Sequence, residues 1–400
     1  MFASLPSTTL TRFILLYAAM YAAFGVASPF LPGFISARGL PPEQLGLVLG
    51  AGTAVRLLTA PLAGRIGDLI QALRIVLVVC TAVAALVTLG YLSAHRFWIL
   101  LAMTLLHAAS LAPITVLADA LALGSASPRP NSSDRRGFEY GWVRGTGSAA
   151  FIVGTLLSGQ AVSALGLDVI VWLQALLLGA AAFAALLVPE PVHARAVDAV
   201  RAPAGGVFIL LRLPLFRNLV LVAALILGSH AMHDAFAVIR WSAAGIGPST
   251  ASLLWSESVV AEVIVFFVIG PALVTRLTPA GAIAVAALAG MLRWAVMAQS
   301  SDVIALALVQ PLHGITFALL HLACMRLLAR TVPQGLEGTA QAIYGTVGIG
   351  AASALLTFVS GALYARLGAQ GFWVMAALCA LAFPLTWSLR QPVFGKSAIQ

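Results

Sequence analysis

Charge is scarce in this sequence: 22 Lys and Arg and 13 Asp and Glu are spread over 400 residues, 9% of the chain. Because 61% of the residues are hydrophobic and the mean hydropathy is +1.02, too little polar surface remains to cover a soluble globule. The net charge of +9 is scattered and forms no basic stripe that could follow a phosphate backbone, which argues against nucleic acid as a partner. The composition therefore predicts an integral membrane protein surrounded by a lipid bilayer.

The sequence also lacks the motifs of most enzymes and metal sites. Its three cysteines, Cys80, Cys324 and Cys379, lie inside apolar runs without CxxC spacing, which argues against a disulfide framework and a zinc site. It contains no nucleophile elbow, phosphate-binding glycine loop or dinucleotide fingerprint. We therefore expect no enzyme activity, no metal and no cofactor. The lack of a repeated filter segment disfavours a channel.

Long apolar runs, in contrast, are abundant. Each of twelve runs has about 20 residues or more, enough to cross a hydrocarbon core of about 30 Å. They cover roughly residues 11–34, 44–66, 72–93, 97–124, 138–164 and 168–188, then 215–241, 250–274, 280–299, 303–329, 337–366 and 371–390. The chain is therefore predicted to be an all-α membrane protein with twelve transmembrane helices.

A polar stretch rich in Pro and Gly, PEPVHARAVDAVRAPAGG from Pro189 to Gly206, separates two sets of six runs. We interpret residues 189–214 as a cytoplasmic linker between six-helix bundles at 1–188 and 215–400. With both termini cytoplasmic, sixteen Lys and Arg fall on the cytoplasmic side and four on the other. The positive-inside rule therefore predicts this orientation and an even number of spans.

Several motifs resemble a known family. GRIGDLIQALR, from Gly64 to Arg74, is similar to the signature between the second and third helices of the major facilitator superfamily, although Leu69 and Gln71 depart from its basic residue and glycine. More specific are PITVLADALAL, YGWVRGTGSAAFIVG, LLWSESVVAEVIVFF, LRWAVM, QPLHGITFALLHLACMR and QAIYGTVGIG. Together they resemble the phenylpropionate permease (3-phenylpropionic acid transporter) branch over nearly the whole chain.

This resemblance implies two six-helix halves around a central substrate cavity and proton-coupled uptake of a small aromatic acid. By this resemblance, the sequence matches the branch at seven ionisable residues within the apolar runs: Asp119, Arg144, His230, Glu262, Arg293, His313 and His321. Asp234 and Glu257 depart from the pattern of the branch.

Ionisable side chains inside the spans are the candidate functional residues, because each costs about 2.5 to 3.5 kcal/mol at mid-membrane and is rarely retained without a cavity or a partner. Arg56 lies near the middle of the second span, and its guanidinium can bind a carboxylate at two points, so we expect it to bind an anionic substrate. The alternative is an ion pair with an acid such as Asp119 or Glu262. Arg293 is the other candidate cation for the substrate, unless it extends to the outer surface, and His230 is a further candidate contact.

Proton coupling requires a group that changes protonation as its surroundings alternate between wet and dry. Glu262 and His313 lie about 18 and 15 Å into spans that run in the same direction, at about 1.5 Å per residue, so they can share one layer. Trp255 is seven residues before Glu262, and His313, Phe317 and His321 are spaced by four, as on one helix face. We predict that Glu262, His313 and His321 carry protons beside aromatic rings, Trp255 and Phe317, that contact the substrate.

A second cluster, His230, His233 and Asp234, lies in the seventh span. His230 and Asp234 are four residues apart, so the carboxylate can orient the imidazole, and Asp234 is a further candidate for proton coupling. A metal site is a weak alternative, because no matching ligands lie elsewhere.

Three charged residues are predicted to gate the inner side. Asp119 and Arg144 would form a pair in one state and break it in the other, although a permanent structural pair is equally compatible with the sequence. Asp68 with Arg74 or Arg136 carries the same ambiguity.

These features predict a secondary active transporter that takes up a small aromatic carboxylate, such as 3-phenylpropionate, together with protons. We expect it to work by alternating access, as a monomer in the bacterial inner membrane. The rivals are a proton-driven efflux pump for drugs or metabolites and a proton symporter of nucleosides or sugars. Polar substrates need several amide side chains in the cavity, and the spans offer few, chiefly Gln160, Gln174, Gln310 and Gln341.

Overall fold

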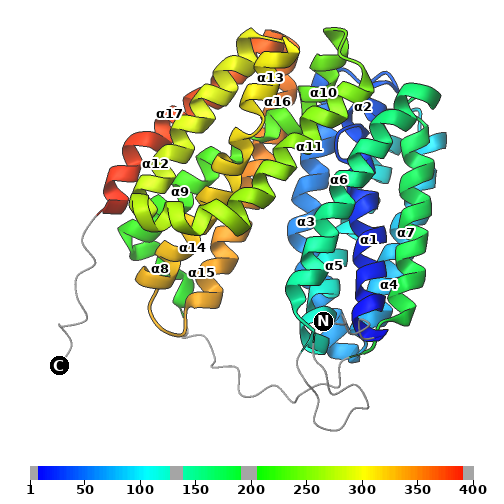
Figure 1. Cartoon of the computed structure of the whole chain (residues 1–400), viewed down its shortest axis with the longest axis horizontal. Helices are drawn as coiled ribbons and strands as arrows, with labels where there is room; N and C mark the ends of the chain where they lie inside the picture. Colours follow the sequence, from blue (N-terminus) through cyan, green and yellow to red (C-terminus); the bar gives the residue numbers. More distant parts are fainter. Residues whose placement is uncertain (1–7, 127–137, 191–204, 391–400) are drawn as a thin grey trace, which may run out of the picture. The chain divides into compact units, whose positions relative to one another are not determined.

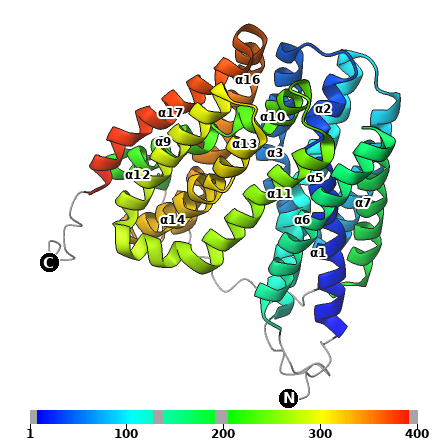
Figure 2. The same cartoon turned by 45° about the horizontal axis from the view of Figure 1, so that its top comes forward.

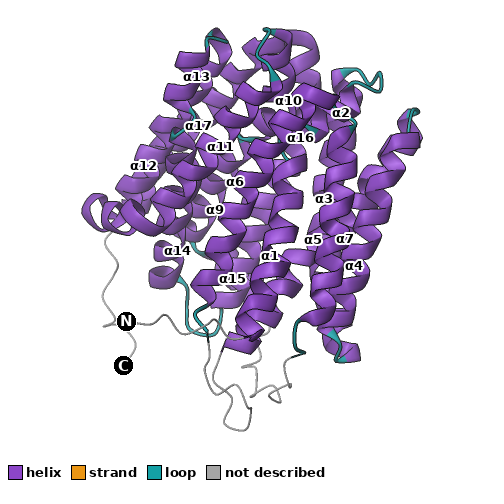
Figure 3. Cartoon of the chain, turned by 45° about the vertical axis from the view of Figure 1, so that its right-hand side comes forward, coloured by secondary structure: helices purple, strands orange, loops and turns teal. Residues whose placement is uncertain are grey.

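The computed structural model describes residues 8–126, 138–190 and 205–390, and these form helices and loops without a strand (Figure 3). They belong to two compact units. Unit 1 lies within Met1–Ala196 and includes Trp241–Ser256, and unit 2 lies within Val197–Arg240 and Glu257–Gln400. Most of the predicted linker, residues 191–204, lies outside the described residues, whereas its last part forms helix α8 (Gly206–Arg212).

Unit 1 contains the first seven helices (Figure 1). They are α1 (Thr8–Ala27), α2 (Leu31–Ser36), α3 (Pro42–Ile70), α4 (Leu73–Gly90) with the 3₁₀ turn η1 (Tyr91–Ser93), α5 (Phe97–Ala126), α6 (Tyr140–Leu165) and α7 (Val169–Leu187). Helix α1 packs against α6 and α7, and it lies between them in Figures 1 and 2. Helix α3 packs against α5, and α4 packs against α5 and α7.

Two glycines allow the backbones of α1 and α6 to touch. A Cβ atom at Gly25 would overlap the carbonyl oxygen of Phe151, and one at Gly154 would overlap the backbone of Ala22. The Thr155 hydroxyl donates a 3.0 Å hydrogen bond to the carbonyl oxygen of Gly25. Small residues permit this close contact, which is a main source of helix association where lipid removes the hydrophobic driving force.

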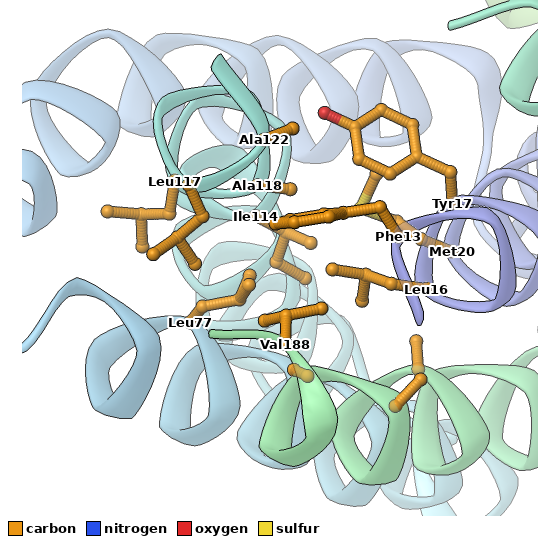
Figure 4. Packing of buried hydrophobic residues seen from close by; sticks show 14 of the residues in the cluster. Phe13, Leu16, Tyr17, Met20, Leu77, Ile114, Leu117, Ala118, Ala122 and Val188 are labelled. Carbon is orange, nitrogen blue, oxygen red and sulfur yellow. The ribbon is translucent and has the colours of Figure 1, made fainter. Parts of the chain in front are cut away.

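The apolar core of unit 1 is formed mainly by α1, α4, α5 and α7. Figure 4 shows Phe13 and Leu16 of α1 packed with Ile114 and Leu117 of α5, all at most 1% exposed. Tyr17 belongs to this cluster, and its hydroxyl bonds the polar residues described below.

Unit 2 contains the remaining helices apart from the segment assigned to unit 1. They are α9 (Pro214–Gly228), α10 (Ala231–Ala243), α11 (Pro248–Ile264), α12 (Gly270–Gln299), α13 (Val303–Val309), α14 (Leu320–Thr331), α15 (Glu337–Ile343), α16 (Ala352–Leu367) and α17 (Phe372–Leu385), with 3₁₀ turns η5 (Gly368–Gly371) and η6 (Thr386–Arg390). Three π-helical segments interrupt them: η2 (Val265–Ile269), η3 (Gly314–Leu319) and η4 (Tyr344–Ala351). Helix α12 packs against α14 and α17.

The described part of the chain has ten helical stretches that are long and apolar enough to cross a membrane. Two of them, Pro248–Gln299 and Glu337–Arg390, have 52 and 54 residues, well over twice the length that one crossing needs. Each contains a residue with a non-helical backbone, Thr278 at φ 62° and Gly368 at φ 54°. Large exposed apolar side chains, such as Trp98 and Trp142, suit contact with lipid.

Candidate functional site

Arg56 is exposed on α3 of unit 1. Among the described residues no carboxylate lies within ion-pair distance of its guanidinium. The two acids named as alternative partners pair elsewhere: Asp119 is near Arg144, and Glu262 is near His313. Tyr91 and His107 are its electrostatic neighbours, and their rings pack edge to face with centroids 5.5 Å apart. The predicted alternative, an ion pair between Arg56 and an acid, is therefore absent from the part of the chain that the structure describes.

Glu262 and His313 meet in unit 2, as their equal depth predicts. The His313 Nε2 atom lies 3.3 Å from Glu262 Oε2, and the two side chains are 17% and 27% exposed respectively. On its other side, His313 accepts a 3.1 Å hydrogen bond at Nδ1 from the Arg293 guanidinium. The carboxylate and the imidazole are thus accessible, whereas the arginine behind them is not.

Arg293 is fully buried, at 0% exposure, in the second half of α12. Its Nη2 atom donates to Gln310 Oε1 at 3.1 Å and to His233 Nε2 at 3.4 Å, and its guanidinium lies over the Trp294 ring. The side chain therefore does not extend to the outer surface. A substrate could reach it only if these partners moved.

His233 continues this chain of contacts to a second acid. Its Nδ1 atom lies 3.2 Å from Asp234 Oδ1, and Asp234 is 62% exposed. The predicted pairing of Asp234 with His230 is wrong: the His230 Nε2 atom contacts the Thr316 hydroxyl at 3.0 Å. Helical spacing holds between the two residues, since the Asp234 N–H donates a 3.0 Å hydrogen bond to the His230 carbonyl oxygen, but each side chain has another partner.

Aromatic rings line the face beside Glu262. The rings of His313 and Phe317 are stacked, with centroids 5.6 Å apart and planes 7° apart, and Phe266 contacts both Phe317 and His321 edge on. His321 also contacts the Tyr344 hydroxyl at 3.3 Å. The stripe of residues spaced by four is therefore present.

The π-helical segments coincide with these aromatic residues. Phe266 lies in η2, Phe317 lies in η3, which begins one residue after His313, and η4 begins at Tyr344. Single π-helical turns inside α-helices are frequent at functional sites. Their concentration around one column of rings marks this face of unit 2 as the candidate site.

Trp255 is 7% exposed on α11 and belongs to the segment grouped with unit 1. It shares a helix with Glu262, but its indole is buried rather than presented on an open face. The other predicted aromatic residue, Phe317, stacks on the His313 ring.

Asp119 is the centre of a tyrosine cluster in unit 1. Its Oδ1 atom accepts hydrogen bonds from the hydroxyls of Tyr17 and, at 2.7 Å, Tyr140, whereas Arg144 Nη1 is 3.9 Å away. Arg144 donates to the Tyr21 hydroxyl and lies over the Tyr21 ring. The two predicted gate residues are therefore neighbours, with tyrosines as their closest partners.

Asp68 is exposed near the end of α3. Its predicted partner Arg74 pairs instead with Glu190, with 3.6 Å between Arg74 Nε and Glu190 Oε2, so that pairing is wrong. The other predicted partner, Arg136, lies outside the described residues. Within the described ranges, no group of three or more His, Cys, Asp and Glu side chains is arranged to hold a metal ion.

The sequence did not reveal the roles of two buried polar residues, Gln310 and His107. Gln310 was expected only as a polar lining residue, yet it is fully buried and bonds Arg293 and His233. The signal that could have revealed it is its position three residues before His313. His107, whose Nε2 atom is buried without a partner among the described residues, gave no signal beyond being a histidine in an apolar run.

The apolar helices, with ion pairs and buried histidines inside their spans, define a membrane protein with several spans. The chain belongs to the MFS_1 like family, which it matches over residues 10–375. It is 34% identical over 372 residues, 92% of this chain and 94% of the other, to the Probable 3-phenylpropionic acid transporter of Escherichia coli (strain K12). It is also 24% identical over 378 residues, 93% of this chain and 92% of the other, to the maltose permease of Geobacillus stearothermophilus.

Solved structures agree with this fold. The nucleoside transporter NupG superposes with a TM-score of 0.81 at 15% identity, covering 96% of this chain and 99% of that chain. The human organic anion transporter MFSD10 superposes with a TM-score of 0.63 at 19% identity, covering 94% and 98%. The protein is therefore an integral membrane secondary transporter of a small molecule.

Proposed function

We propose that this protein takes up a small aromatic carboxylate, such as 3-phenylpropionate, together with protons by alternating access. The observation that carries the proposal is the 3.3 Å contact between Glu262 and His313, which lies inside membrane spans and beside the stacked ring of Phe317. An accessible acid joined to an imidazole can gain and lose a proton as its surroundings change. In this proposal, Glu262 with His313 carries the coupled proton.

Arg56 binds the substrate carboxylate in this scheme. Its support is that the guanidinium is exposed on α3 and has no carboxylate partner among the residues described. An unpaired cation within a span is costly, and an anionic ligand offsets that cost. Arg293 is the less suitable cation, because it is fully buried and already holds two histidines and Gln310.

The substrate class rests on two observations. The relative that is 34% identical over most of the chain carries the name of a 3-phenylpropionic acid transporter. In addition, the amides that a nucleoside or sugar would need are mostly engaged: Gln310 and Gln174 are at most 2% exposed, and Gln160 accepts a hydrogen bond from Ser249. The partly buried rings beside Glu262 suit the apolar part of an aromatic acid.

For the topology, we propose twelve spans with both termini in the cytoplasm of a bacterial cell and the chain in its inner membrane. The breaks at Thr278 and Gly368 support two crossings for each of the two longest stretches. Residues 1–188 and 215–400 form the two halves of a monomer, and 189–214 link them. Asp119, Arg144 and Asp68 gate the inner side.

Proteoliposomes test the proposal directly. Labelled 3-phenylpropionate should accumulate when the side from which uptake occurs is made acidic, and accumulation should stop when an ionophore collapses the pH gradient. Uptake that ignores the gradient would remove the proton from the mechanism. If inward proton flow drove the acid outward, the protein would be an efflux pump and not an uptake system. If a nucleoside or sugar were transported and this acid were not, the proposed substrate class would be wrong.

A further inference from the structure

We infer that Arg293 joins two proton-binding arms, Glu262–His313 and Asp234–His233, into one unit that titrates cooperatively. This inference rests on the proposed function for its role in transport, but it concerns the protein's own residues. The arms start on α11 and α10, and both end on the same guanidinium in α12, at 3.1 Å from His313 and 3.4 Å from His233.

The hydrogen-bond chemistry of arginine fixes both histidine tautomers. A guanidinium has donors and no acceptor, so His313 must accept at Nδ1 and His233 must accept at Nε2. In the neutral imidazole the remaining ring nitrogen then carries the hydrogen. That nitrogen faces a carboxylate in each case, Glu262 at 3.3 Å and Asp234 at 3.2 Å. The two arms are therefore equivalent relays that share one hub.

Proton uptake that charges the imidazole of either arm, or reverses its tautomer, disturbs the hub. If Glu262 becomes a neutral acid and donates to His313 Nε2, the imidazole hydrogen moves to Nδ1 and meets the donor of Arg293. If His313 itself becomes an imidazolium, both ring nitrogens are donors and the same contact is lost. In both cases Arg293 loses its hydrogen bond to His313 but stays buried. His233 and Gln310 are then the acceptors that still hold the guanidinium.

The charges favour one shared proton. With neutral histidines, Glu262 and Asp234 outweigh the single positive charge of Arg293 by one, so one proton makes the group neutral. A second proton would leave a net positive charge around a hub that is 0% exposed, which is unfavourable without an anion. A bound carboxylate substrate would supply that anion, which links the second proton to the substrate.

Other titratable groups also face the hub and belong in its description. His230 lies 5.1 Å from His313 between ring centroids and contacts Thr316. Cys379 of α17 is near Arg293 and contacts the Ser229 hydroxyl at 3.4 Å. Neither bonds directly to a carboxylate among the described residues, so they surround the relay without extending it.

Solid-state NMR of ¹⁵N-histidine-labelled protein in lipid bilayers tests the coupling without any substrate. The His233 signal, assigned by its loss in His233→Asn, is followed as a function of pH. Near neutral pH we expect the Nδ1–H tautomer for His233 and the Nε2–H tautomer for His313. Glu262→Gln should move the His233 titration midpoint by about one pH unit or more, because groups coupled through one hub titrate together.

Two comparisons complete the experiment. Glu257→Gln, on the same helix as Glu262 and with no ion pair among the described residues, should leave the His233 midpoint unchanged. In an Arg293→Lys background, one ammonium cannot bond both imidazole rings. Adding Glu262→Gln to that background should therefore leave the His233 midpoint unchanged as well. An unmoved midpoint in Glu262→Gln, or the opposite tautomer on either ring, overturns the inference, even if Arg293→Lys fails to fold. Failure of gradient-driven uptake in the unsubstituted protein would instead remove the proposed function and leave this NMR result standing.

Discussion

The Nε2 atom of His313 lies 3.3 Å from Oε2 of Glu262, although 51 residues separate them in the chain. The contact joins α11 to the turn between α13 and η3, so it links two helical spans of unit 2. Both side chains are partly accessible, which distinguishes this pair from a purely structural ion pair in the core.

Glu262→Gln is the first test of this contact. The amide keeps the size of the side chain and can still contact His313, but it cannot take up a proton. We expect counterflow exchange of labelled for unlabelled substrate to continue, since exchange needs no net proton movement, whereas gradient-driven accumulation should be lost. Parallel counterflow and accumulation assays in proteoliposomes measure the two. Accumulation that survives the substitution excludes Glu262 as the coupling acid.

Arg56→Gln tests the proposed substrate cation. Charge-assisted hydrogen bonds contribute about 1.5 to 3 kcal/mol, so the KM for the carboxylate should rise about ten- to hundredfold. Arg56→Lys should recover part of the affinity, because it restores the charge but not the two-point contact. Transport kinetics at several substrate concentrations give these values.

The matched control for Arg56 is Arg65→Gln. Arg65 is also exposed on α3, nine residues further along, and it has no proposed role. Its KM should stay close to that of the unsubstituted protein. Equal effects at both positions would indicate a general loss of positive charge on this helix rather than a binding site at Arg56.

The membrane class and helical fold could be predicted from the sequence, because they follow from composition. So could the approach of Glu262 to His313, since a regular rise per residue converts position into depth along two spans. The predicted pairing of His230 with Asp234 failed, because helical spacing does not tell which partner a side chain takes: His230 contacts Thr316 of another segment, and Asp234 contacts its neighbour His233.

The hub at Arg293 could not have been predicted. Depth along a helix does not tell which neighbour a side chain faces, and the sequence allowed Arg293 to reach either a substrate or the outer surface. Its actual partners come from α10 and from the turn after α13, and that arrangement depends on how three helices pack. The pairing of Arg74 with Glu190 was missed for the same reason, because 116 residues separate them.

Asp119→Asn tests the predicted inner gate. The amide removes the negative charge that faces Arg144 and weakens the acceptor of the Tyr17 and Tyr140 hydroxyls. If these contacts form in one state only, a loss of about 1.4 kcal/mol shifts the equilibrium between states about tenfold, and the counterflow rate should change accordingly. A changed thermal unfolding midpoint with an unchanged counterflow rate would favour a permanent structural cluster.

Asp168→Asn provides the control for that substitution. Asp168 pairs with Arg38 at 3.1 Å, also within unit 1, and its side chain is 67% exposed. The pair borders a cavity of about 510 Å³ lined by Phe34, Ala37, Arg38, Gly39, His95, Leu167 and Asp168. Because the Asp168 carboxylate is largely in solvent, the pair should contribute only about 0 to 1 kcal/mol, and this variant should change neither the counterflow rate nor the unfolding midpoint appreciably.

Gly154→Ala should destabilise unit 1, because the added Cβ atom overlaps the backbone of Ala22. A backbone segment cannot relieve such an overlap by changing rotamer, as a flexible side chain can. We expect a loss of about 1 to 3 kcal/mol, the usual cost of overpacking, and a lower unfolding midpoint in detergent. Gly145→Ala on the same helix is the control, since no atom lies within 4 Å of its added Cβ and alanine favours a helix more than glycine does. If both variants unfolded at the same temperature, the contact between α1 and α6 would not depend on the small residue at Gly154.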